Sequence, residues 1–239
     1  MRSRLSSNSW VLTSPVAHRG LHGEGAGENT FTAYQRAIDK GYPIEMDVQL
    51  TSDGVPVCFH DDNLVRVTGE NALIWDKTYD QIKHLKISGT NDGIPLFGEF
   101  LSFVDGKVPL MIEIKKQKSG NSGIEKKVVD LLKDYKGEYV IQSFDPRIMA
   151  KIKKLNPQII RGQLGGGVVK GQIPFLQYVV VKNMLLNFLS KPDFINYDLN
   201  CAPLKKNLPV IYYTVRTEEQ IKKLKSLNAN FVFENVKPE

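Results

Sequence analysis

The chain has 239 residues, of which 41% are hydrophobic and 24% charged, and its formal net charge is +6. This length suits one α/β-barrel or all-β domain, or two small domains, and the composition excludes a disordered chain. Two cysteines, Cys58 and Cys201, exclude a disulfide framework and a cysteine-based zinc site. The modest, dispersed positive charge permits an anionic substrate but does not indicate nucleic acid.

Eight short apolar runs bounded by Gly, Pro, Asn or Asp predict β-strands. In chain order they are residues 15–20, 43–50, 109–115, 139–144, 158–164, 193–199, 209–215 and 230–234. Helical patterns separate most of them, at residues 30–40, 123–135, 146–155, 175–190 and 217–227. We expect Asn29 to cap the first helix and a capping box of Thr217 and Gln220 to begin the last.

Strands that alternate with helices indicate a parallel sheet with crossover helices. Eight such repeats predict a single (β/α)₈ TIM barrel over residues 1–239, for which about 250 residues is typical. A doubly wound open sheet is the alternative, and the absence of G-x-G-x-x-G after the first strand argues against it. A turn signal at Thr51–Gly54 followed by an apolar run predicts a hairpin. We place a small insertion at about residues 51–108, with one short helix near 79–85.

No part of the sequence has the character of a membrane or secretion segment. Residues 1–10 are polar and lack the apolar run of a secretory signal. The most apolar segment, residues 175–189, contains Lys182 and two asparagines and is shorter than the roughly 18 apolar residues of a spanning helix. We interpret this segment as a buried or interface helix, and we expect no membrane contact because it lacks a basic face. The expectation is a soluble, cytoplasmic protein.

Charged residues occur in two predicted strands that should be apolar on both faces. Side chains alternate along a strand, so Glu45 and Asp47 point to the same side, as do Glu113 and Lys115. Buried charges need partners. One interpretation is an internal salt-bridge cluster, which would add little net stability. The other is a site for a hard cation, Mg²⁺ or Ca²⁺, with carboxylate ligands, and with Lys115 holding an anionic oxygen nearby.

Two histidines follow elements that should end near these carboxylates. His18 and Arg19 end the first strand, and the active sites of parallel barrels lie at the carboxyl ends of their strands. His60 ends the predicted hairpin. A nearby anion raises the pKa of an imidazole and a nearby cation lowers it. The two histidines can therefore serve as an acid and a base. We interpret the other two histidines, His22 and His84, as structural or surface residues.

The ordered set of these motifs resembles the glycerophosphodiester phosphodiesterase family. The matching positions are His18-Arg19-Gly20, Glu28-Asn29-Thr30, Ala33, Gly41, Glu45, Asp47, Thr51, Asp53-Gly54, His60-Asp61, Leu64, Arg66, Thr68, Glu113 and Lys115. The resemblance implies a (β/α)₈ barrel with an insertion after the second strand. It also implies metal-dependent hydrolysis of a small-molecule phosphodiester to glycerol 3-phosphate and an alcohol, within lipid and glycerol metabolism.

The resemblance implies a role for each matching site residue. Glu45, Asp47 and Glu113 correspond to the metal ligands, and Arg19 and Lys115 to phosphate contacts. His18 and His60 correspond to the general acid–base pair. We assign His60 as the acid and His18 as the base, although the two roles can be exchanged. The nucleophile is water or a hydroxyl of the substrate itself.

Two segments depart from the family pattern. Residues 212–216 read Tyr-Tyr-Thr-Val-Arg where relatives often have Trp-Thr-Val-Asn, and residues 233–236 read Phe-Glu-Asn-Val in place of a Thr-Asp-x-Pro turn. Both segments would line the alcohol or glycerol side of the pocket, so the departures affect which substrates the site would accept. Arg216 is either a further phosphate contact or a solvent-exposed residue.

Two other functions remain as alternatives. A phospholipase D-like enzyme acting on lysophospholipids shares several of these motifs, but such relatives are typically secreted and disulfide-bonded. A non-catalytic barrel would lack a ligand or a histidine, and none is missing here. The sequence makes no prediction of oligomeric state.

Overall fold

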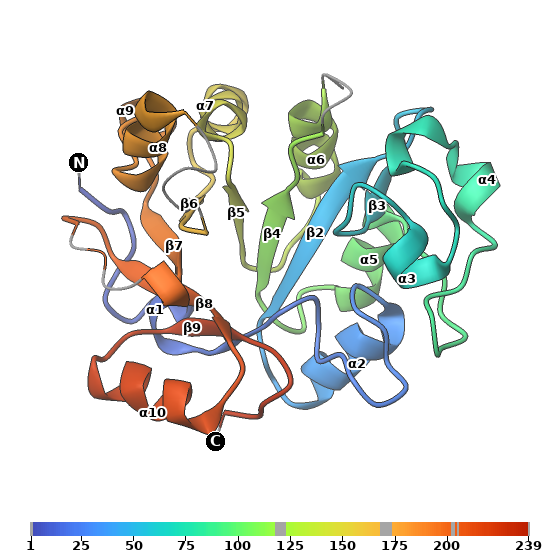
Figure 1. The fold of residues 1–239 in the computed structure, drawn as a ribbon, viewed down its shortest axis with the longest axis horizontal. Coiled ribbons are helices and arrows are strands. Elements are labelled where there is room, and N and C mark those ends of the chain that lie inside the picture. Colours follow the sequence, from blue (N-terminus) through green and yellow to red (C-terminus); the bar gives the residue numbers. More distant parts are fainter. Residues whose placement is uncertain (1, 118–122, 168–173, 202–203, 205, 239) are drawn as a thin grey trace. The chain divides into compact units, whose positions relative to one another are not determined.

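The structure is a computed structural model that describes residues 2–117, 123–167, 174–201, 204 and 206–238 (Figure 1). The chain divides into two compact units. Residues 16–139 form one, which we call the N-terminal unit. Residues 1–15 and 140–239 form the other, which we call the C-terminal unit.

The N-terminal unit is built around a fully buried central strand, β2. Its elements are β1 (Val16–Ala17), α2 (Phe31–Asp39), β2 (Ile44–Leu50), β3 (Pro56–Cys58), α3 (Val65–Thr68), η1 (Ile74–Asp76), α4 (Tyr79–Ile82), α5 (Phe97–Val104), β4 (Leu110–Ile114) and α6 (Ile124–Leu132). Strands β1 and β4 flank β2 in parallel. Strand β3 is antiparallel to β2, with Cys58 opposite Val48. This pairing confirms the predicted hairpin, which returns the chain to the end of β2.

The segment between β2 and β4 contains more structure than the sequence analysis predicted. The predicted short helix is present as α4, whereas α3, η1 and α5 were not anticipated. Eight buried apolar side chains of this segment pack into a small core of their own. They are Val57, Phe59, Leu64, Val67, Ile74, Ile82, Ile87 and Ile94. This core, together with the pairing of β3 with β2, fixes the loop that carries His60.

The first strand is shorter than predicted, because the chain turns sharply after Ala17. Arg19 and Gly20 have φ values of 54° and 79°, so both leave the extended conformation. A side chain at position 20 would also meet Ala33, since a Cβ there would lie 2.9 Å from the Ala33 backbone. Glycine at this position therefore lets the turn pack directly against α2.

The predicted cap of α2 is wrong by one residue. Thr30 is the N-cap, and its side chain accepts a hydrogen bond from the backbone N–H of Ala33. Asn29 has a φ of 54° and does not cap the helix. The Asn29 side chain therefore takes no part in capping this helix.

The C-terminal unit alternates strands and helices in the predicted order. Its elements are α1 (Trp10–Thr13), β5 (Tyr139–Ser143), α7 (Pro146–Leu155), β6 (Arg161–Gly165), α8 (Phe175–Lys182), α9 (Asn187–Ser190), β7 (Phe194–Asp198), η2 (Leu199–Cys201), β8 (Val210–Val215), α10 (Glu218–Ser226) and β9 (Phe231–Phe233). Strands β5 to β9 pair in parallel with their neighbours in chain order. The capping box of Thr217 and Gln220 is present.

The helix predicted at residues 175–190 is two helices. Met184 has a φ of 50°, which a continuing helix does not allow, and it separates α8 from α9. The interpretation of this segment as buried is also wrong, because most of its large apolar side chains are exposed. No helix in the described part of the chain is long and apolar enough to span a membrane.

Candidate active site

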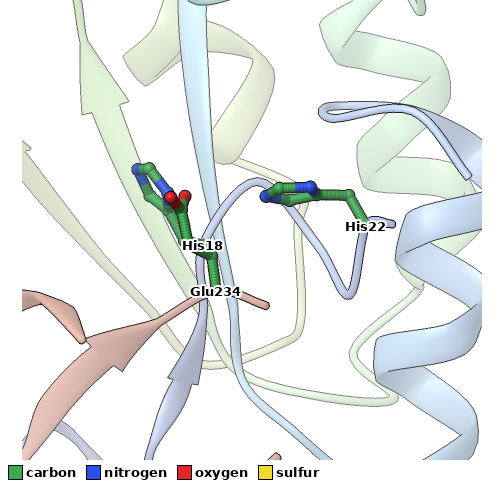
Figure 2. Close-up of side chains that lie close together, drawn as sticks. All are labelled: His18, His22 and Glu234. Carbon is green, nitrogen blue, oxygen red and sulfur yellow. The ribbon is translucent and has the colours of Figure 1, made fainter. Parts of the chain in front are cut away.

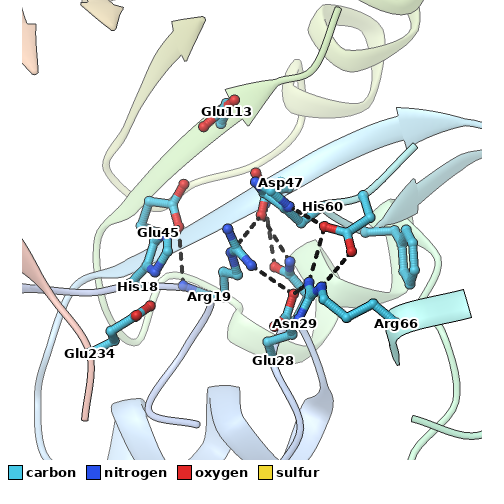
Figure 3. A network of polar contacts seen from close by, with 12 residues as sticks. His18, Arg19, Glu28, Asn29, Glu45, Asp47, His60, Arg66, Glu113 and Glu234 are labelled. Atoms are coloured by element: carbon cyan, nitrogen blue, oxygen red, sulfur yellow. Dashed lines mark hydrogen bonds and ion pairs between the residues drawn. The ribbon is translucent and has the colours of Figure 1, made fainter. Parts of the chain in front are cut away.

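Three carboxylates meet on one face of the two adjacent strands β2 and β4 of the N-terminal unit (Figure 3). Glu45 and Asp47 lie two residues apart on β2, and Asp47 stands directly opposite Glu113 on β4. Only 2%, 1% and 7% of Glu45, Asp47 and Glu113 are exposed. One oxygen from each of the three lies within 4.8 Å of the others. We call this group the acidic cluster.

Lys115 partly neutralises the acidic cluster. Its Nζ lies 2.9 Å from Glu113 Oε1 and 3.5 Å from Asp47 Oδ1. Burial alone would lower the pKa of Lys115, but the two carboxylates outweigh it and the pKa is raised. Lys115 is therefore a fixed cation at the edge of the cluster.

Arg19 approaches the cluster from the turn after β1. Its backbone N–H donates to Glu45 Oε2 at 3.1 Å, and its Nη1 donates to Glu28 Oε1 at 2.7 Å. Its Nε lies 3.4 Å from Asp47 Oδ2 but is a buried nitrogen without a hydrogen-bond partner among the described atoms. An unsatisfied guanidinium N–H at this position is suited to an anionic oxygen.

The electrostatics of Asp47 and Glu45 differ. Burial raises the pKa of Asp47, but Lys115, His60 and Arg19 together hold it below its usual range. Burial, reinforced by the charges of Asp47 and Glu113, raises the pKa of Glu45 well above its usual range. Glu45 thus has less compensating positive charge beside it than Asp47 has.

This imbalance separates the two interpretations of the charged residues. An internal salt-bridge cluster accounts for Asp47 and Glu113, which both contact Lys115, but leaves Glu45 without a comparable cation. A divalent cation bound by all three carboxylates would supply the missing charge. The donor set consists of carboxylate oxygens, which Mg²⁺ and Ca²⁺ prefer, so the residues present fit such an ion.

The structure brings both predicted histidines to this cluster. His18 Nε2 lies 4.0 Å from Glu45 Oε2. His60 lies on the Asp47 side, where its charge contributes to the lowered pKa of Asp47 (Figure 3). The two imidazoles therefore flank the carboxylates from different elements, the end of β1 and the loop after β3.

A chain of charged contacts orients His60 and runs through Asp61, Arg66 and Glu28. Asp61 Oδ1 lies 2.5 Å from His60 Nδ1. Arg66 binds Asp61 Oδ2 through its Nε at 2.5 Å and Glu28 Oε1 through its Nη2 at 2.6 Å. Burial raises the pKa of Asp61, but hydrogen bonds from Arg66 and His60 outweigh it and the pKa is lowered. An ionised Asp61 on Nδ1 leaves Nε2 as the reactive nitrogen of His60.

Two buried amides, Asn29 and Gln49, support the site, and the sequence analysis assigned neither of them this role. Asn29 Nδ2 donates to Asp47 Oδ2 at 3.0 Å, so the residue predicted as a cap holds a carboxylate in place. Gln49 Nε2 donates to the carbonyls of Phe59, His60 and Asp61 at 3.1, 2.9 and 2.8 Å. Strand alternation places Gln49 on the same face as Glu45 and Asp47, and this signal was available in the sequence.

The other predicted residues lie outside this arrangement. His22 is the exception: it is half-buried in the loop that follows His18, and a ring nitrogen of each of the two histidines lies within 4.8 Å of the other (Figure 2). His84 is exposed on the insertion. Arg216, in the C-terminal unit, is half-exposed and its Nε lies 2.6 Å from Glu234 Oε1. Of the two predicted states of Arg216, the described contacts therefore show the solvent-exposed one, paired with an acid.

Comparisons with known proteins agree on one family. Residues 18–236 match the model described as the Glycerophosphoryl diester phosphodiesterase family. A glycerophosphodiester phosphodiesterase of Bacillus altitudinis is 30% identical over 233 residues, which cover 93% of this chain and 94% of that protein. One from Caldanaerobacter subterraneus is 35% identical over 166 residues, or 64% of this chain and 67% of that protein.

A solved structure shows the same fold. It is that of an Oleispira antarctica phosphodiesterase in complex with the product sn-glycerol-3-phosphate. The TM-score is 0.78 at 23% identity, over 92% of each chain. The described residues contain three parallel strands in the N-terminal unit and five in the C-terminal unit, the number that the predicted fold requires. The fold class is a (β/α)₈ TIM barrel with an insertion after the second strand, as predicted.

Proposed function

The chain belongs to the Glycerophosphoryl diester phosphodiesterase family and is a phosphoric diester hydrolase, and we propose that it hydrolyses glycerophosphodiesters to glycerol 3-phosphate and an alcohol with a bound divalent cation. The observation that carries this proposal is the acidic cluster, with Lys115 and Arg19 at its edge and one imidazole on each side. A phosphodiester is an anion that resists attack by a nucleophile. A site for its hydrolysis needs positive charge for the phosphate and proton donors and acceptors for the oxygens.

The proposed cation ligands are Glu45, Asp47 and Glu113. A bound Mg²⁺ or Ca²⁺ would neutralise charge on the phosphate oxygens in the transition state. Asn29 keeps Asp47 in a fixed orientation through the hydrogen bond between Nδ2 and Oδ2. The lowered pKa of Asp47 supports a carboxylate that is ionised and ready to bind a cation at neutral pH.

The proposed phosphate contacts are Lys115 and Arg19. Lys115 carries its charge at the edge of the cluster, where its Nζ can donate to a phosphate oxygen as well as to Glu113. The buried Arg19 Nε has no hydrogen-bond partner among the described atoms and can donate to the same group. Both donors are fixed before substrate binds, so little reorganisation accompanies the reaction.

His60 is the proposed general acid and His18 the proposed general base. As the nucleophilic oxygen forms its bond to phosphorus, His18 takes the proton from that oxygen. The bond from phosphorus to the alcohol oxygen then breaks, and that oxygen takes a proton from His60. Asp61 on Nδ1 holds the His60 ring so that Nε2 is the nitrogen available for this proton transfer. With water as the nucleophile this step gives glycerol 3-phosphate directly. With a hydroxyl of the glycerol group it gives a cyclic phosphodiester, which water then opens as His60 takes the proton from the water and His18 returns a proton to the glycerol oxygen.

Phosphorus NMR of the products tests the proposal. The protein is incubated with a panel of glycerophosphodiesters that differ in their alcohol, in chelator alone and after Mg²⁺ or Ca²⁺ is restored. We expect glycerol 3-phosphate from at least one member, loss of turnover in chelator and recovery with one of the ions. Turnover that survives thorough chelation would remove the metal from the mechanism. Faster release of alcohol from a lysophospholipid would instead favour the phospholipase D-like alternative.

A further inference from the structure

Helices α8 and α9 of the C-terminal unit present a large apolar surface to solvent. Seven side chains, which we call the α8–α9 patch, are more than a third exposed: Phe175, Leu176, Val181, Leu185, Leu186, Phe188 and Leu189. The exposed fractions reach 69% for Phe175, 75% for Leu176 and 66% for Phe188. Single exposed apolar residues are ordinary, but a contiguous group of large ones indicates an interaction surface.

Met184 and Ser190 are the described residues of this segment that are buried, and they set which side of it faces solvent. Met184 is buried and lies against Gly165 at the end of β6, where a Cβ would come within 2.6 Å of the Met184 thioether methyl. The segment is therefore anchored between the two helices through Met184. Leu185, next in the chain, is directed outward and is half-exposed.

The helices around the patch carry positive charge and no negative charge. No acidic residue occurs between Asp145 and Asp193 in the sequence. Helix α7 packs against α9 and contributes Lys153 and Lys154, while Lys182 ends α8 and Lys191 follows α9 (Figure 1). Desolvation, together with the charges of Lys191, Arg161 and Lys154, lowers the pKa of Lys153.

The acidic residues at the two ends of this stretch each form an ion pair with an arginine. Asp145 lies 2.6 Å from Arg147 Nη2, and Asp193 lies 2.7 Å from Arg4 Nη2. They are therefore committed to cations other than the lysines around the patch. The surface combines large apolar side chains with a positive charge.

The chemistry of this surface selects among possible occupants. A second copy in a two-fold symmetric contact would bring the same lysines against one another, which is unfavourable. A bilayer that contains anionic lipids accepts both features, because apolar side chains enter the headgroup region while lysines bind the negative surface. We propose that the α8–α9 patch docks the protein on the surface of an anionic lipid bilayer.

This proposal replaces the expectation from the sequence that the segment makes no membrane contact. The segment has no basic face of its own, and that expectation rested on this observation. The fold adds two lysines of α7 to Lys182 and Lys191, and α7 is separate in the sequence from residues 175–189. Docking does not depend on which phosphodiester the active site hydrolyses.

Vesicle flotation tests the proposal with the full-length protein. One set of vesicles contains phosphatidylcholine alone, and the other contains equal amounts of phosphatidylcholine and phosphatidylglycerol. The apolar variant is Phe175→Ser/Leu176→Ser/Phe188→Ser, and the charge variant is Lys182→Gln/Lys191→Gln. Leu227→Ser is the matched control, because Leu227 is 61% exposed in the same unit but lies at the end of α10.

We expect wild-type protein to float with the anionic vesicles and not with the neutral ones. The apolar variant should lose at least roughly 100-fold in affinity. The charge variant should lose roughly 20-fold, and Leu227→Ser should bind as wild type. Unchanged thermal unfolding shows that the variants are folded. Absence of wild-type binding, or binding that the apolar variant retains, would overturn the proposal. So would a dimer, seen by light scattering, that the apolar variant dissociates.

Discussion

The N-terminal unit buries three carboxylates beside β2 and β4, whereas the C-terminal unit exposes a group of large apolar side chains on α8 and α9. Burial of charge and exposure of apolar surface are both unfavourable for folding. Each of these regions departs from the pattern that stabilises the rest of its unit. Such departures are expected where a protein binds something that the folded chain alone does not contain.

The two regions differ in how firmly their side chains are held. Lys115, Arg19 and Asn29 contact the acidic cluster, and Asp61 orients the histidine beside it. In the segment that carries the α8–α9 patch, Met184 and Ser190 are buried, whereas the side chains of the patch itself are exposed. A site for chemistry requires fixed groups, while a surface that enters a lipid headgroup region does not. The following predictions test this difference, beginning with the largest effect.

Replacement of a carboxylate in the acidic cluster should have the largest effect on turnover. Asp47→Asn removes a ligand charge from the proposed cation site and leaves the shape of the side chain almost unchanged. We expect kcat/KM for a glycerophosphodiester to fall by at least about 10³-fold, with little change in thermal unfolding. Glu99→Gln, which alters an exposed carboxylate on α5, is the control and should retain activity. Near wild-type turnover in Asp47→Asn would contradict the assigned role.

Replacement of either histidine should lower turnover by about 10²- to 10⁴-fold. In His60→Gln the pH–rate profile should lose its alkaline limb, since the proposed acid is no longer present to lose its proton. In His18→Gln it should lose its acidic limb. If each variant loses the opposite limb, the two histidines have exchanged roles. If both variants keep both limbs, neither residue is the acid or the base.

Removal of the charge on Asp61 should have a smaller effect. Asp61→Asn should lower kcat by about 10- to 100-fold, as expected for a group that orients a catalytic residue. The loss should fall on kcat and not on KM, because Asp61 contacts His60 and is not one of the proposed phosphate contacts. Asp62→Asn changes the adjacent carboxylate and is the matched control. A kcat equal to that of the wild type, or a loss that falls on KM alone, would contradict this positioning role.

The smallest expected effect is on the free energy of unfolding, and it comes from an ion pair in the C-terminal unit. Arg4 Nε donates to the buried Asp193 at 2.8 Å. Arg4→Met should lower the free energy of unfolding by about 1–3 kcal/mol. Burial raises the pKa of Asp193, but Arg4 and the Arg161 backbone N–H outweigh it and the pKa is lowered.

This lowered pKa fixes the pH dependence of the Arg4 effect. A carboxyl with a lowered pKa stabilises the fold above its unfolded pKa of about 3.9, and this stabilisation is lost as the pH falls. The difference between wild type and Arg4→Met should therefore be constant near neutral pH and shrink below about pH 4. Urea unfolding at several pH values measures it, with Arg2→Met as the control. A difference that is the same at all pH values would contradict the ion pair.

The sequence predicted those features that depend on the period of a strand. Alternation along β2 placed Glu45 and Asp47 on one face, and the parallel pairing with β4 brought Glu113 beside them. The (β/α)₈ fold followed in the same way from the repetition of strands and helices. Local periodicity carries this information because it reflects which face of an element is buried.

Other features depend on contacts that periodicity does not encode. The turn at Arg19 and Gly20 shortened β1, and Thr30 took the capping role predicted for Asn29. The surface position of α8 and α9 depends on how Met184 packs against Gly165, and the lysines beside them come partly from a different helix. These outcomes are determined by tertiary packing, which a single sequence does not display.

Calorimetric titration of the metal-free protein with Mg²⁺, and separately with Ca²⁺, tests the central claim most directly. We predict that wild-type protein binds one equivalent of at least one of these ions in the absence of substrate. Glu45→Gln should weaken this binding by more than about 100-fold, and Glu99→Gln should leave it unchanged. Equal binding by wild type and Glu45→Gln, or no binding of either ion by an active wild-type enzyme, would contradict the claim that the buried carboxylates form a cation site.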